Sequence, residues 1–346
     1  MSRPERLEAV PDGRCAGARA VAEAIAGARR IILTTHVNAD GDGVGSEVAM
    51  VHLLRALGKQ VSIANPTPIP DRYRFLVEPI ARHDRTADAK QALRDADLFL
   101  VLDIADLGRL GHLAETIRAR DIVTACIDHH LSPGTLPAGP RLVDAEASAT
   151  AELVCDLTAV NGWTMGAEAA RALYVGILTD TGGFRFSNTT PRVLRVAASL
   201  LETGVDPERV YESVYATAPA GRIRLTAEVL ETLVVEPEIG LSWVTVPAGA
   251  LERHDVTADD LDGLVEFARS VQGTRLALLF RQLANGKTKV SLRSVGDFDV
   301  AVFAKQFGGG GHAKASGASV AGPLDEAQRL VLGAARAALA PQGASR

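Results

Sequence analysis

Histidines and aspartates gather at three places in the first half of this chain, each directly after an apolar run. The segment THVNADGDGVGS places His36, Asp40 and Asp42 within seven residues. Asp103 ends a second apolar run, and the sequence 128–130 (Asp-His-His) ends a third. Mixed imidazole and carboxylate ligands suit Mn²⁺, Fe or Zn²⁺, whereas Ca²⁺ prefers oxygen ligands alone. The pattern therefore indicates a transition-metal centre.

The apolar runs before these residues are predicted to be strands of one mostly parallel sheet flanked by helices, which is an α/β fold. Expected strands cover 30–35, 61–65, a run ending near Asp103 and a run from about 121 to Asp128, and expected helices cover 44–57, 148–160 and 167–180. Ligands bind at the carboxyl ends of the strands in such sheets. The candidate residues should therefore meet at one rim.

Several carboxylates at one rim repel one another, and their pKa values rise unless cations lie between them. Two divalent ions about 3.5–4 Å apart, bridged by a carboxylate, can activate a water and stabilise the attacking and leaving oxygens at phosphorus. The sequence thus favours metal-dependent hydrolysis of a phosphate ester. Asp180, in GILTDTGG, could by itself simply end its helix, and Asp106 and Asp144 are interpreted as surface or turn residues.

The second half follows a different pattern, which predicts a smaller α+β domain with a mixed sheet. Residues 206–232 form an amphipathic connector that begins with Asp-Pro. Three strands are expected in LSWVTVP, RLALLFRQ and KVSLRSV, the last two joined by a two-residue Asn-Gly hairpin. A capping box at Thr257 should open one helix, and 325–340 should form another.

A glycine-rich segment at 308–317 (GGGGHAKASG) is the candidate for substrate binding. Consecutive glycines allow backbone N–H groups to surround an anion, and His312, Lys314 and Ser316 could add donors. Arg293 could form a bidentate contact with a phosphate. The alternatives are a flexible surface turn for the glycines and an exposed strand charge for Arg293.

Composition and competing motifs narrow the function classes. The 346 residues, 47% hydrophobic and 23% charged, suit two globular domains, and a net charge of −5 argues against a grip on long nucleic acid. Three scattered cysteines suit a reducing cytoplasm, and neither a signal peptide nor a membrane span is expected. The loop GDGVG lacks the spacing of a dinucleotide fingerprint, and neither glycine-rich loop has the Gly-Lys-Ser/Thr of a P-loop.

The motifs resemble those of the DHH phosphoesterase superfamily. HVNADGDGVGS resembles its first motif, VLDIADLGRLG its second, IDHH its third and GILTDTGGFRFSNTT its fourth. GGGGHAKASG is similar to the signature of the DHH-associated C-terminal domain. Ala39 stands where the first motif commonly has proline, which affects no ligand. The resemblance implies a catalytic domain over 15–205, a helical linker over 206–232 and a substrate-binding domain over 233–346.

The resemblance also implies a role for each site residue. One metal would be held by His36, Asp40 and Asp103, and the other by Asp42, Asp103, His129 and Asp180, with Asp103 as the bridge. His130 would face the scissile phosphate as transition-state stabiliser or proton donor, and Asp128 would orient a ligand. In the second domain, the substrate's terminal phosphate or base would be held by Arg293, Gly309, Gly310, Gly311, His312 and Ser316.

The residues of the motifs and the length of the chain are most similar to those of the nanoRNase and pAp phosphatase branch. This resemblance implies two divalent ions, preferably Mn²⁺. Implied substrates are short oligoribonucleotides, pAp, and also pApA or cyclic di-AMP. A homodimer is suggested, without a defined interface. An inorganic pyrophosphatase is the alternative enzyme, a RecJ-like exonuclease would be longer, and membrane-bound cyclic-dinucleotide phosphodiesterases would carry added transmembrane and sensor regions. A non-catalytic nucleotide-binding module is the alternative outside enzymes.

Overall fold

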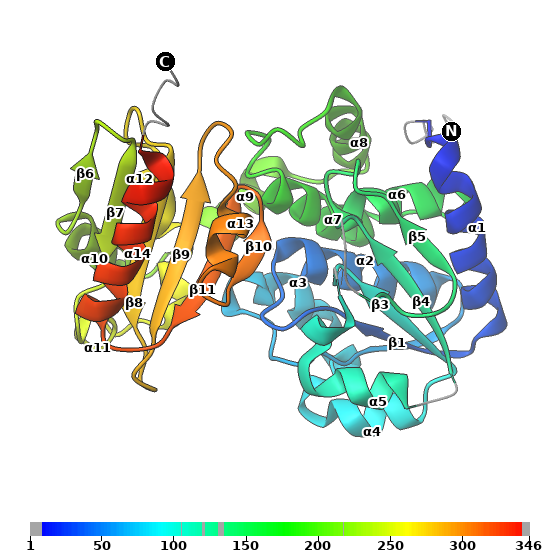
Figure 1. The fold of residues 1–346 in the computed structure, drawn as a ribbon. Helices are drawn as coiled ribbons and strands as arrows, with labels where there is room; N and C mark the ends of the chain where they lie inside the picture. The colour runs from blue at the N-terminus through cyan, green and yellow to red at the C-terminus, as the bar shows by residue number, and fades with distance from the viewer. Residues whose placement is uncertain (1–8, 105, 120–121, 131–134, 217, 341–346) are drawn as a thin grey trace, which may run out of the picture. The chain divides into compact units, whose positions relative to one another are not determined.

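The computed structural model describes residues 9–340 except 105, 120–121, 131–134 and 217. The chain divides into two compact units, Met1–Thr217 and Ala218–Arg346. Each unit contains one sheet (Figure 1). No helix among the described residues is long and apolar enough to cross a membrane.

The first unit contains a five-stranded, fully parallel sheet in the order β2-β1-β3-β4-β5. Its strands are β1 (Arg30–Thr34), β2 (Gln60–Ile63), β3 (Leu98–Leu102), β4 (Val123–Asp128) and β5 (Arg141–Val143). All five residues of β3 are buried, as expected for a central strand covered on both faces. The predicted α/β class is confirmed, and the short edge strand β5 is an element that the sequence pattern did not reveal.

Helices cover both faces of this sheet. In β3, Phe99 and Val101 pack against the α4 and α5 side, whereas Leu100 and Leu102 pack against the α2, α6 and α7 side. The helices are α1 (Asp12–Gly27), α2 (Gly41–Ala56), α3 (Arg74–Val77), α4 (Ala89–Arg94), α5 (Ala114–Arg118), α6 (Thr150–Val160), α7 (Ala167–Asp180), α8 (Pro191–Glu202) and α9 (Pro207–Tyr215). Short 3₁₀ turns are η1 (Asp71–Tyr73), η2 (Glu78–His83), η3 (Thr86–Asp88) and η4 (Leu107–Leu113).

The glycines of GDGVG allow α2 to pack closely against α7. A Cβ at Gly45 would lie 2.4 Å from the Ala172 carbonyl oxygen, and one at Gly41 would lie 2.4 Å from Thr179 Oγ1. Both distances are shorter than real Cβ contacts allow. The spacing of the glycines in GDGVG, which is similar to that of a dinucleotide-binding loop, is therefore explained by close packing between helices. The helix also begins at Gly41 rather than at the predicted residue 44, because the Asp40 carboxylate caps it.

The second unit has a six-stranded mixed sheet in the order β10-β11-β9-β8-β7-β6, in which only the β7–β8 pair is parallel. The strands are β6 (Val234–Glu236), β7 (Leu241–Thr245), β8 (Leu276–Gln282), β9 (Thr288–Ser294), β10 (Gly310–His312) and β11 (Ala315–Val320). The helices are α10 (Ala220–Leu230), α11 (Ala250–Arg253), α12 (Leu264–Arg269), α13 (Val300–Lys305) and α14 (Leu324–Leu339), with η5 (Ala258–Leu261) as a 3₁₀ turn. The predicted mixed sheet is confirmed.

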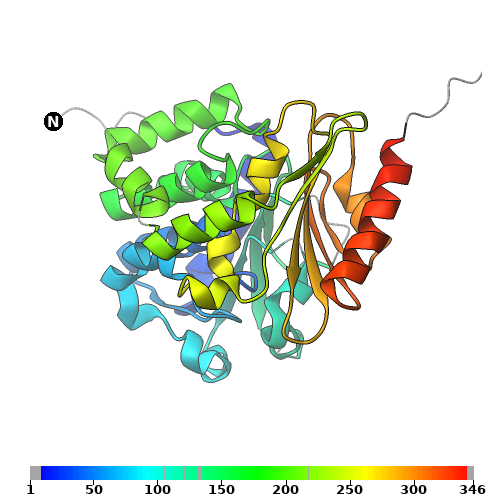
Figure 2. The same ribbon diagram turned by 90° about the vertical axis from the view of Figure 1, so that its left-hand side faces the viewer.

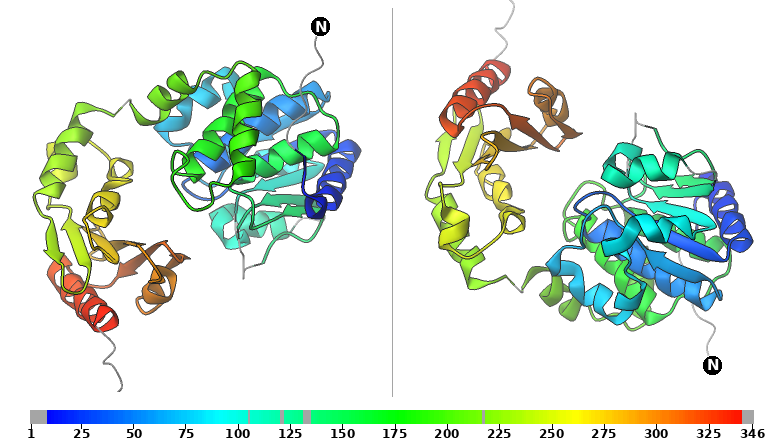
Figure 3. Two further views of the ribbon diagram at one scale, coloured as in Figure 1. Left: turned by 90° about the horizontal axis from the view of Figure 1, so that it is seen from above. Right: turned by 90° about the horizontal axis from the view of Figure 1, so that it is seen from below.

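Two apolar clusters lie on the two faces of the second sheet. One contains α13 and α14 residues, and the other contains residues of α10, α11 and α12. Figure 2 shows α14 (red) on one face of the sheet and α11 and α12 (yellow) on the other, and both views of Figure 3 show the same arrangement. The sheet is therefore covered on both sides.

Two local predictions in this unit were wrong. The β8–β9 hairpin has a three-residue loop closed by Leu283 and Lys287, because Gly286 adopts the left-handed conformation that such loops require. Thr257 donates its backbone N–H to the Asp260 carboxylate at 2.9 Å, as a capping box does. The segment nevertheless forms only a 3₁₀ turn, and α12 starts after Gly263, which also has a positive φ.

Candidate active site

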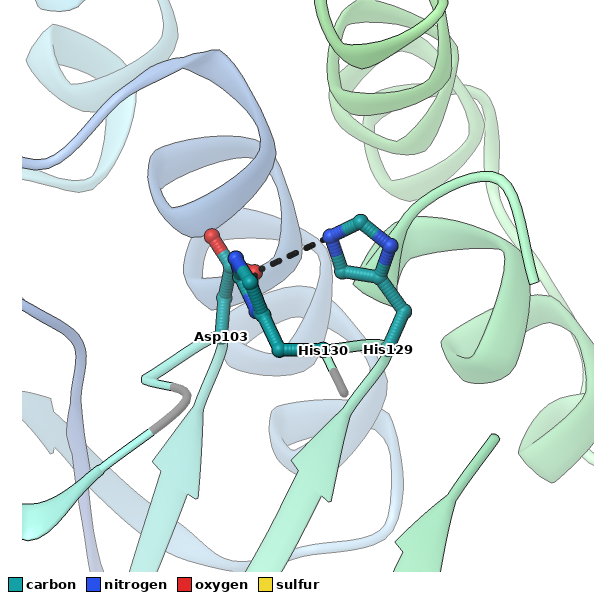
Figure 4. Close-up of side chains that lie close together, drawn as sticks. All are labelled: Asp103, His129 and His130. Atoms are coloured by element: carbon teal, nitrogen blue, oxygen red, sulfur yellow. Dashed lines mark ion pairs between the residues drawn. The ribbon is translucent and has the colours of Figure 1, made fainter. Parts of the chain in front are cut away.

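The predicted metal ligands converge at the carboxyl ends of the parallel strands of the first unit. His36 lies just beyond β1, Asp103 directly after β3 and His129 directly after β4. Asp40 caps α2, and Asp180 is the last residue of α7. Figure 4 shows the two histidines beside the Asp103 carboxylate. Three overlapping groups could hold an ion: His36, Asp40 and Asp103; Asp42, His129 and Asp180; and Asp103, His129 and His130.

In the first group, one imidazole nitrogen of His36 faces two carboxylates. His36 Nε2 is 3.6 Å from Asp40 Oδ2 and 3.6 Å from Asp103 Oδ2. The other ring nitrogen, Nδ1, is 2.8 Å from the Val37 carbonyl oxygen, which can only accept a hydrogen bond. Nδ1 therefore carries a proton, which leaves Nε2 as the ring atom that faces the carboxylates and could bind a metal ion. This buried Nε2 has no hydrogen-bond partner.

In the second group, His129 has the same arrangement. Its Nε2 lies 3.5 Å from Asp180 Oδ2, 3.6 Å from Asp103 Oδ1 and 3.8 Å from Asp42 Oδ2. Its Nδ1 is 3.3 Å from the carbonyl oxygen of Ala147. Both histidines are thus oriented by a backbone carbonyl, as metal-bound histidines usually are.

The distances fit ligands of a shared ion better than hydrogen bonds between side chains. A hydrogen bond would bring N and O to about 2.7–3.2 Å. Two ligands that each lie about 2.0–2.2 Å from one ion are themselves separated by roughly 3–3.6 Å. Four of these separations, 3.5–3.6 Å, fall in this range, and the His36 Nε2 atom has no hydrogen-bond partner, so the cluster suits divalent metal ions, which these residues can hold.

The backbone at Asp103 is strained in a way that aims its side chain at the site. Its φ is +56°, a left-handed conformation that non-glycine residues rarely adopt. Its backbone N–H still donates to the Ile127 carbonyl oxygen at 3.0 Å, so the residue remains tied to the neighbouring strand. Strain of this kind is common where a side chain must take a functional position.

Burial and charge repulsion act strongly on this cluster. Burial, together with the nearby Asp103 carboxylate, raises the pKa of Asp42 well above its usual range. Burial and repulsion from Asp40 and Asp103 do the same to the pKa of Asp180. For His36, burial lowers the pKa, but Asp103 and Asp40 outweigh it and raise the pKa to about 10. The site therefore calls for positive charge, which protons or metal ions can supply.

Asp128 orients His130. The fully buried Asp128 carboxylate accepts hydrogen bonds from the backbone N–H of His130 at 3.2 Å and from its Nδ1 at 2.8 Å. Because a carboxylate accepts from Nδ1–H, Asp128 fixes both the tautomer and the orientation of the His130 ring. His130 Nδ1 also lies 3.5 Å from Asp103 Oδ1, which places this imidazole at the edge of the metal-ligand cluster.

Two residues that the sequence analysis did not single out contact the site. The Thr150 hydroxyl donates to Asp103 Oδ1 at 3.1 Å. Asn188 Nδ2 donates to the carbonyl oxygens of Ser148 at 2.9 Å and Asp180 at 3.2 Å, which links the segment before α6 to the end of α7. Thr150 has no recognisable sequence signal, because it resembles any helix start, whereas Asn188 lies within the motif GILTDTGGFRFSNTT, which could have indicated it. Asp106 and Asp144 have local roles: Asp106 caps η4, and Asp144 pairs with Arg14.

In the second unit, the residues predicted to bind substrate fall on both faces of the sheet. His312 pairs in register with Ala315, and Ala315 pairs with Arg293, so these three lie in one transverse row. Ser316 is one residue further along and pairs with Leu292, and it is buried. Neighbouring strand residues point to opposite faces. The sheet therefore separates the Ser316 side chain from that of Arg293.

The glycine-rich segment and Arg293 also have structural roles. A Cβ at Gly309 would lie 2.2 Å from the Gly317 carbonyl oxygen, and one at Gly311 would lie 2.6 Å from that of Ala315. These glycines thus allow β10 to approach β11, and residues 310–317 of the segment predicted to form a nest are an edge hairpin. Arg293 Nε donates to Glu266 Oε1 at 2.7 Å. The side chain of His312 lies outside the described residues.

Comparison with known proteins agrees with the fold and the site. The model of the "DHH family, N-terminal domain" matches residues 30–177, and that of the "DHHA1 domain" matches 242–339. The chain is 36% identical over 318 residues to the bifunctional oligoribonuclease and PAP phosphatase NrnA of Thermus thermophilus, covering 90% of this chain and 91% of that protein. It is 29% identical to the NrnA of Bacillus subtilis, over 87% of this chain and 92% of that one.

A solved structure gives the same result. An exopolyphosphatase-related protein from Bacteroides fragilis superimposes with a TM-score of 0.86 at 27% identity, covering 94% of this chain and 96% of that one. RecJ from Thermus thermophilus shares the fold at 18% identity, with a TM-score of 0.57, over 97% of this chain and 56% of that one. Fold, ligand cluster and similarities together define the chain as a metal-dependent phosphoesterase. It belongs to the DHH family and carries the DHHA1 domain.

Proposed function

We propose that this protein is a Mn²⁺-dependent phosphoesterase that hydrolyses short oligoribonucleotides to mononucleotides and pAp to AMP. The names of two full-length relatives, each an oligoribonuclease and PAP phosphatase, support this proposal. Activity on pApA and cyclic di-AMP is included as a further part of it, because both present a phosphodiester beside an adenosine.

The observation that carries the proposal is the pair of candidate metal groups that meet at Asp103. His36, Asp40 and Asp103 would hold one ion, and Asp42, Asp103, His129 and Asp180 the other. When bound, two such ions supply an activated water and neutralise charge at the phosphate. Asp103 lies 3.6 Å from the facing nitrogen of each of His36 and His129, a position that suits a bridging carboxylate.

The protein's own groups would complete the chemistry. His130, held at Nδ1 by Asp128, presents Nε2 for a hydrogen bond to the phosphoryl oxygens or for proton donation to the leaving oxygen. Because Asp128 accepts from both the ring and the backbone of His130, the imidazole is fixed before substrate arrives. A fixed donor of this kind loses little entropy in the transition state.

We propose that the second unit binds the nucleotide. Arg293 and His312 share a transverse row of the sheet, and two residues further along lies the row of Gly310, Gly317 and Ser291, in which the two glycines carry no side chains. In this proposal Arg293 contacts a phosphate, and the backbone of Gly309, Gly310 and Gly311 approaches it closely. Ser316, buried in the other face, would act only through its backbone.

Further parts of the proposal follow from composition. The net charge of −5 suits short substrates, because little positive charge is available to hold a long strand. A cytoplasmic location and a homodimer are proposed with it. The domain limits proposed from the motifs are 15–205 for catalysis, 206–232 for the linker and 233–346 for substrate binding.

A panel of substrates tests the proposal. Turnover of pAp, pApA, cyclic di-AMP and a short RNA is measured as kcat/KM with Mn²⁺, Mg²⁺ and Co²⁺, and pyrophosphate is added as the alternative substrate. We expect hydrolysis of pAp and of the short RNA to be fastest with Mn²⁺. Preference for pyrophosphate would contradict the proposed substrate class. Tight nucleotide binding without any turnover would contradict the enzyme and favour a binding module.

A further inference from the structure

The first turn of α6 is capped by a residue of another helix. Ala149, which precedes the helix, has no side chain that could accept a hydrogen bond. The backbone N–H of Thr150 instead donates to Asp42 Oδ2 at 2.6 Å, and that of Ala151 donates to Asp42 Oδ1 at 2.8 Å. The predicted metal ligand Asp42 therefore satisfies two N–H groups that the helix leaves free. In return, the helix fixes both carboxylate oxygens.

Thr150 contacts both candidate metal groups. Its backbone N–H binds Asp42, a member of one group, while its hydroxyl donates to Asp103 Oδ1 at 3.1 Å, a member of the other. The residue is completely buried. One side chain and its own backbone thus determine how two carboxylates of the site lie relative to each other.

A buried ion-pair network holds α6 in place independently of the Thr150 hydroxyl. Glu152 Oε2 accepts hydrogen bonds from the backbone N–H and the hydroxyl of Ser148, both at 2.8 Å. Arg14 Nη1 donates to Glu152 at 2.7 Å and to Asp156 at 2.8 Å, and Arg192 pairs with the same two carboxylates. Because Arg14, Glu152 and Asp156 are buried, these pairs are shielded from solvent.

We propose that Thr150 is a positioning residue for the metal centre, whose hydroxyl sets the orientation of the Asp103 carboxylate relative to Asp42 and so the spacing of two bound ions. The inference rests on the proposed function only in requiring that divalent ions bind these carboxylates. It requires no particular substrate. Groups that orient metal ligands typically contribute 10–100-fold to metal affinity or activity.

The test compares three variants of the full chain. Thr150→Val removes the hydroxyl at nearly constant shape, and Thr150→Ser restores it. Thr158→Val is the matched control, because Thr158 is a buried threonine of the same helix whose hydroxyl donates only to the Val154 carbonyl oxygen, at 2.8 Å. The readouts are Mn²⁺ titration by calorimetry and the electron paramagnetic resonance spectrum of the Mn²⁺-loaded protein, which reports coupling between two neighbouring Mn²⁺ ions.

We expect Thr150→Val to weaken Mn²⁺ binding at one site by roughly 10–100-fold and to change the spin coupling. Thr150→Ser should restore both properties, and Thr158→Val should leave both unchanged. Wild-type affinities and coupling in Thr150→Val would overturn the inference, as would equal losses in Thr158→Val. A wild-type protein that binds Mn²⁺ normally but hydrolyses none of the proposed substrates would refute the proposed function alone, because these readouts involve no substrate.

Discussion

The metal-ligand cluster of the first unit and the glycine-rich hairpin of the second unit differ in how their residues are used. In the cluster, His36 Nε2 is buried, faces two carboxylates and has no hydrogen-bond partner. At the hairpin, Gly309 is required by the approach of β11, and Arg293, on the adjacent strand β9, is paired with Glu266. A structural role explains the hairpin residues without any ligand. Among the side chains that the structure describes in these two regions, the buried polar atom without a hydrogen-bond partner is His36 Nε2, in the cluster.

The difference shows which kind of site can be inferred from a static structure. A metal centre requires several rare side chains with lone pairs facing one point, and packing alone does not produce that arrangement. A glycine-rich surface can serve a strand pairing, a substrate or both. Variants that separate metal binding from substrate binding can therefore show whether the two regions differ in function as they differ in structure.

The largest effect is expected from Asp103→Asn. Asparagine tolerates the left-handed backbone of Asp103, so the variant removes the charge while keeping the local conformation. We expect kcat to fall by more than roughly 100-fold, because residues that only orient metal ligands already contribute up to about that much. We also expect fewer bound metal ions. Turnover of pApA and metal content by mass spectrometry check this. Near-wild-type turnover would exclude Asp103 as the bridge.

A smaller effect is expected from Asp128→Asn. The variant weakens the charged hydrogen bond at His130 Nδ1 without removing a predicted ligand. We expect kcat to fall by roughly 10–100-fold, with KM and metal content unchanged. Steady-state kinetics and a Mn²⁺ titration measure the three quantities. A change in KM alone would show that Asp128 acts on substrate binding instead.

Arg293→Met examines the hairpin side of the comparison. Loss of a charge-assisted contact should raise KM by roughly tenfold or more, at constant metal content. Glu266 keeps Arg269 as a partner, so the variant leaves no unpaired carboxylate. Arg329→Met, on α14, is the control for a lost surface charge. Equal KM values for both variants would assign Arg293 to structure alone.

His312→Ala should likewise raise KM more than it alters metal binding.

The smallest effect on activity is expected at Glu47, where the change concerns stability and pH. Burial raises the pKa of Glu47 from 4.5 to about 8, against the lowering effect of its hydrogen bond from Asn65. Between these values the folded state keeps a proton that the unfolded state has lost. As pH rises between these values, the contribution of this carboxyl should therefore lower the free energy of unfolding by about 1.4 kcal/mol per pH unit.

Glu47→Gln removes this titration, so the free energy of unfolding should depend less steeply on pH between about 5 and 8. Urea unfolding at several pH values measures the slope. Glu202→Gln, at the exposed end of α8, is the matched control and should keep the wild-type slope. An unchanged slope in Glu47→Gln would show that the buried carboxyl does not take up a proton on folding.

Much of the fold and the metal cluster could be predicted because their signals are local. The β3 run is apolar along its whole length, and His36, Asp40 and Asp42 share one loop. Local spacing gives little support for Asp180 as a metal ligand, since an aspartate often ends a helix. Its prediction as a ligand depended on the family motif. Its place beside His129 results from the packing of α7 against α2.

The remainder depends on tertiary approach and could not be read locally. Thr150 has no distinctive sequence context, and its role appears only when α6 meets Asp42. Four glycines in a row fit a nest or a tight strand pairing equally well, and the pairing of β10 with β11 becomes visible only in the folded chain. The face of the sheet on which the Ser316 side chain lies could not be predicted either, because a shift of one residue in strand register reverses that face.

The most direct test of the account is a Mn²⁺ titration of the metal-free protein, followed simultaneously by metal binding and by pAp hydrolysis. The account predicts two bound ions per chain, with hydrolysis appearing fully only when both sites are filled. Full activity with a single ion, or hydrolysis that persists in the metal-free protein, would contradict a centre in which Asp103 joins two metal ions.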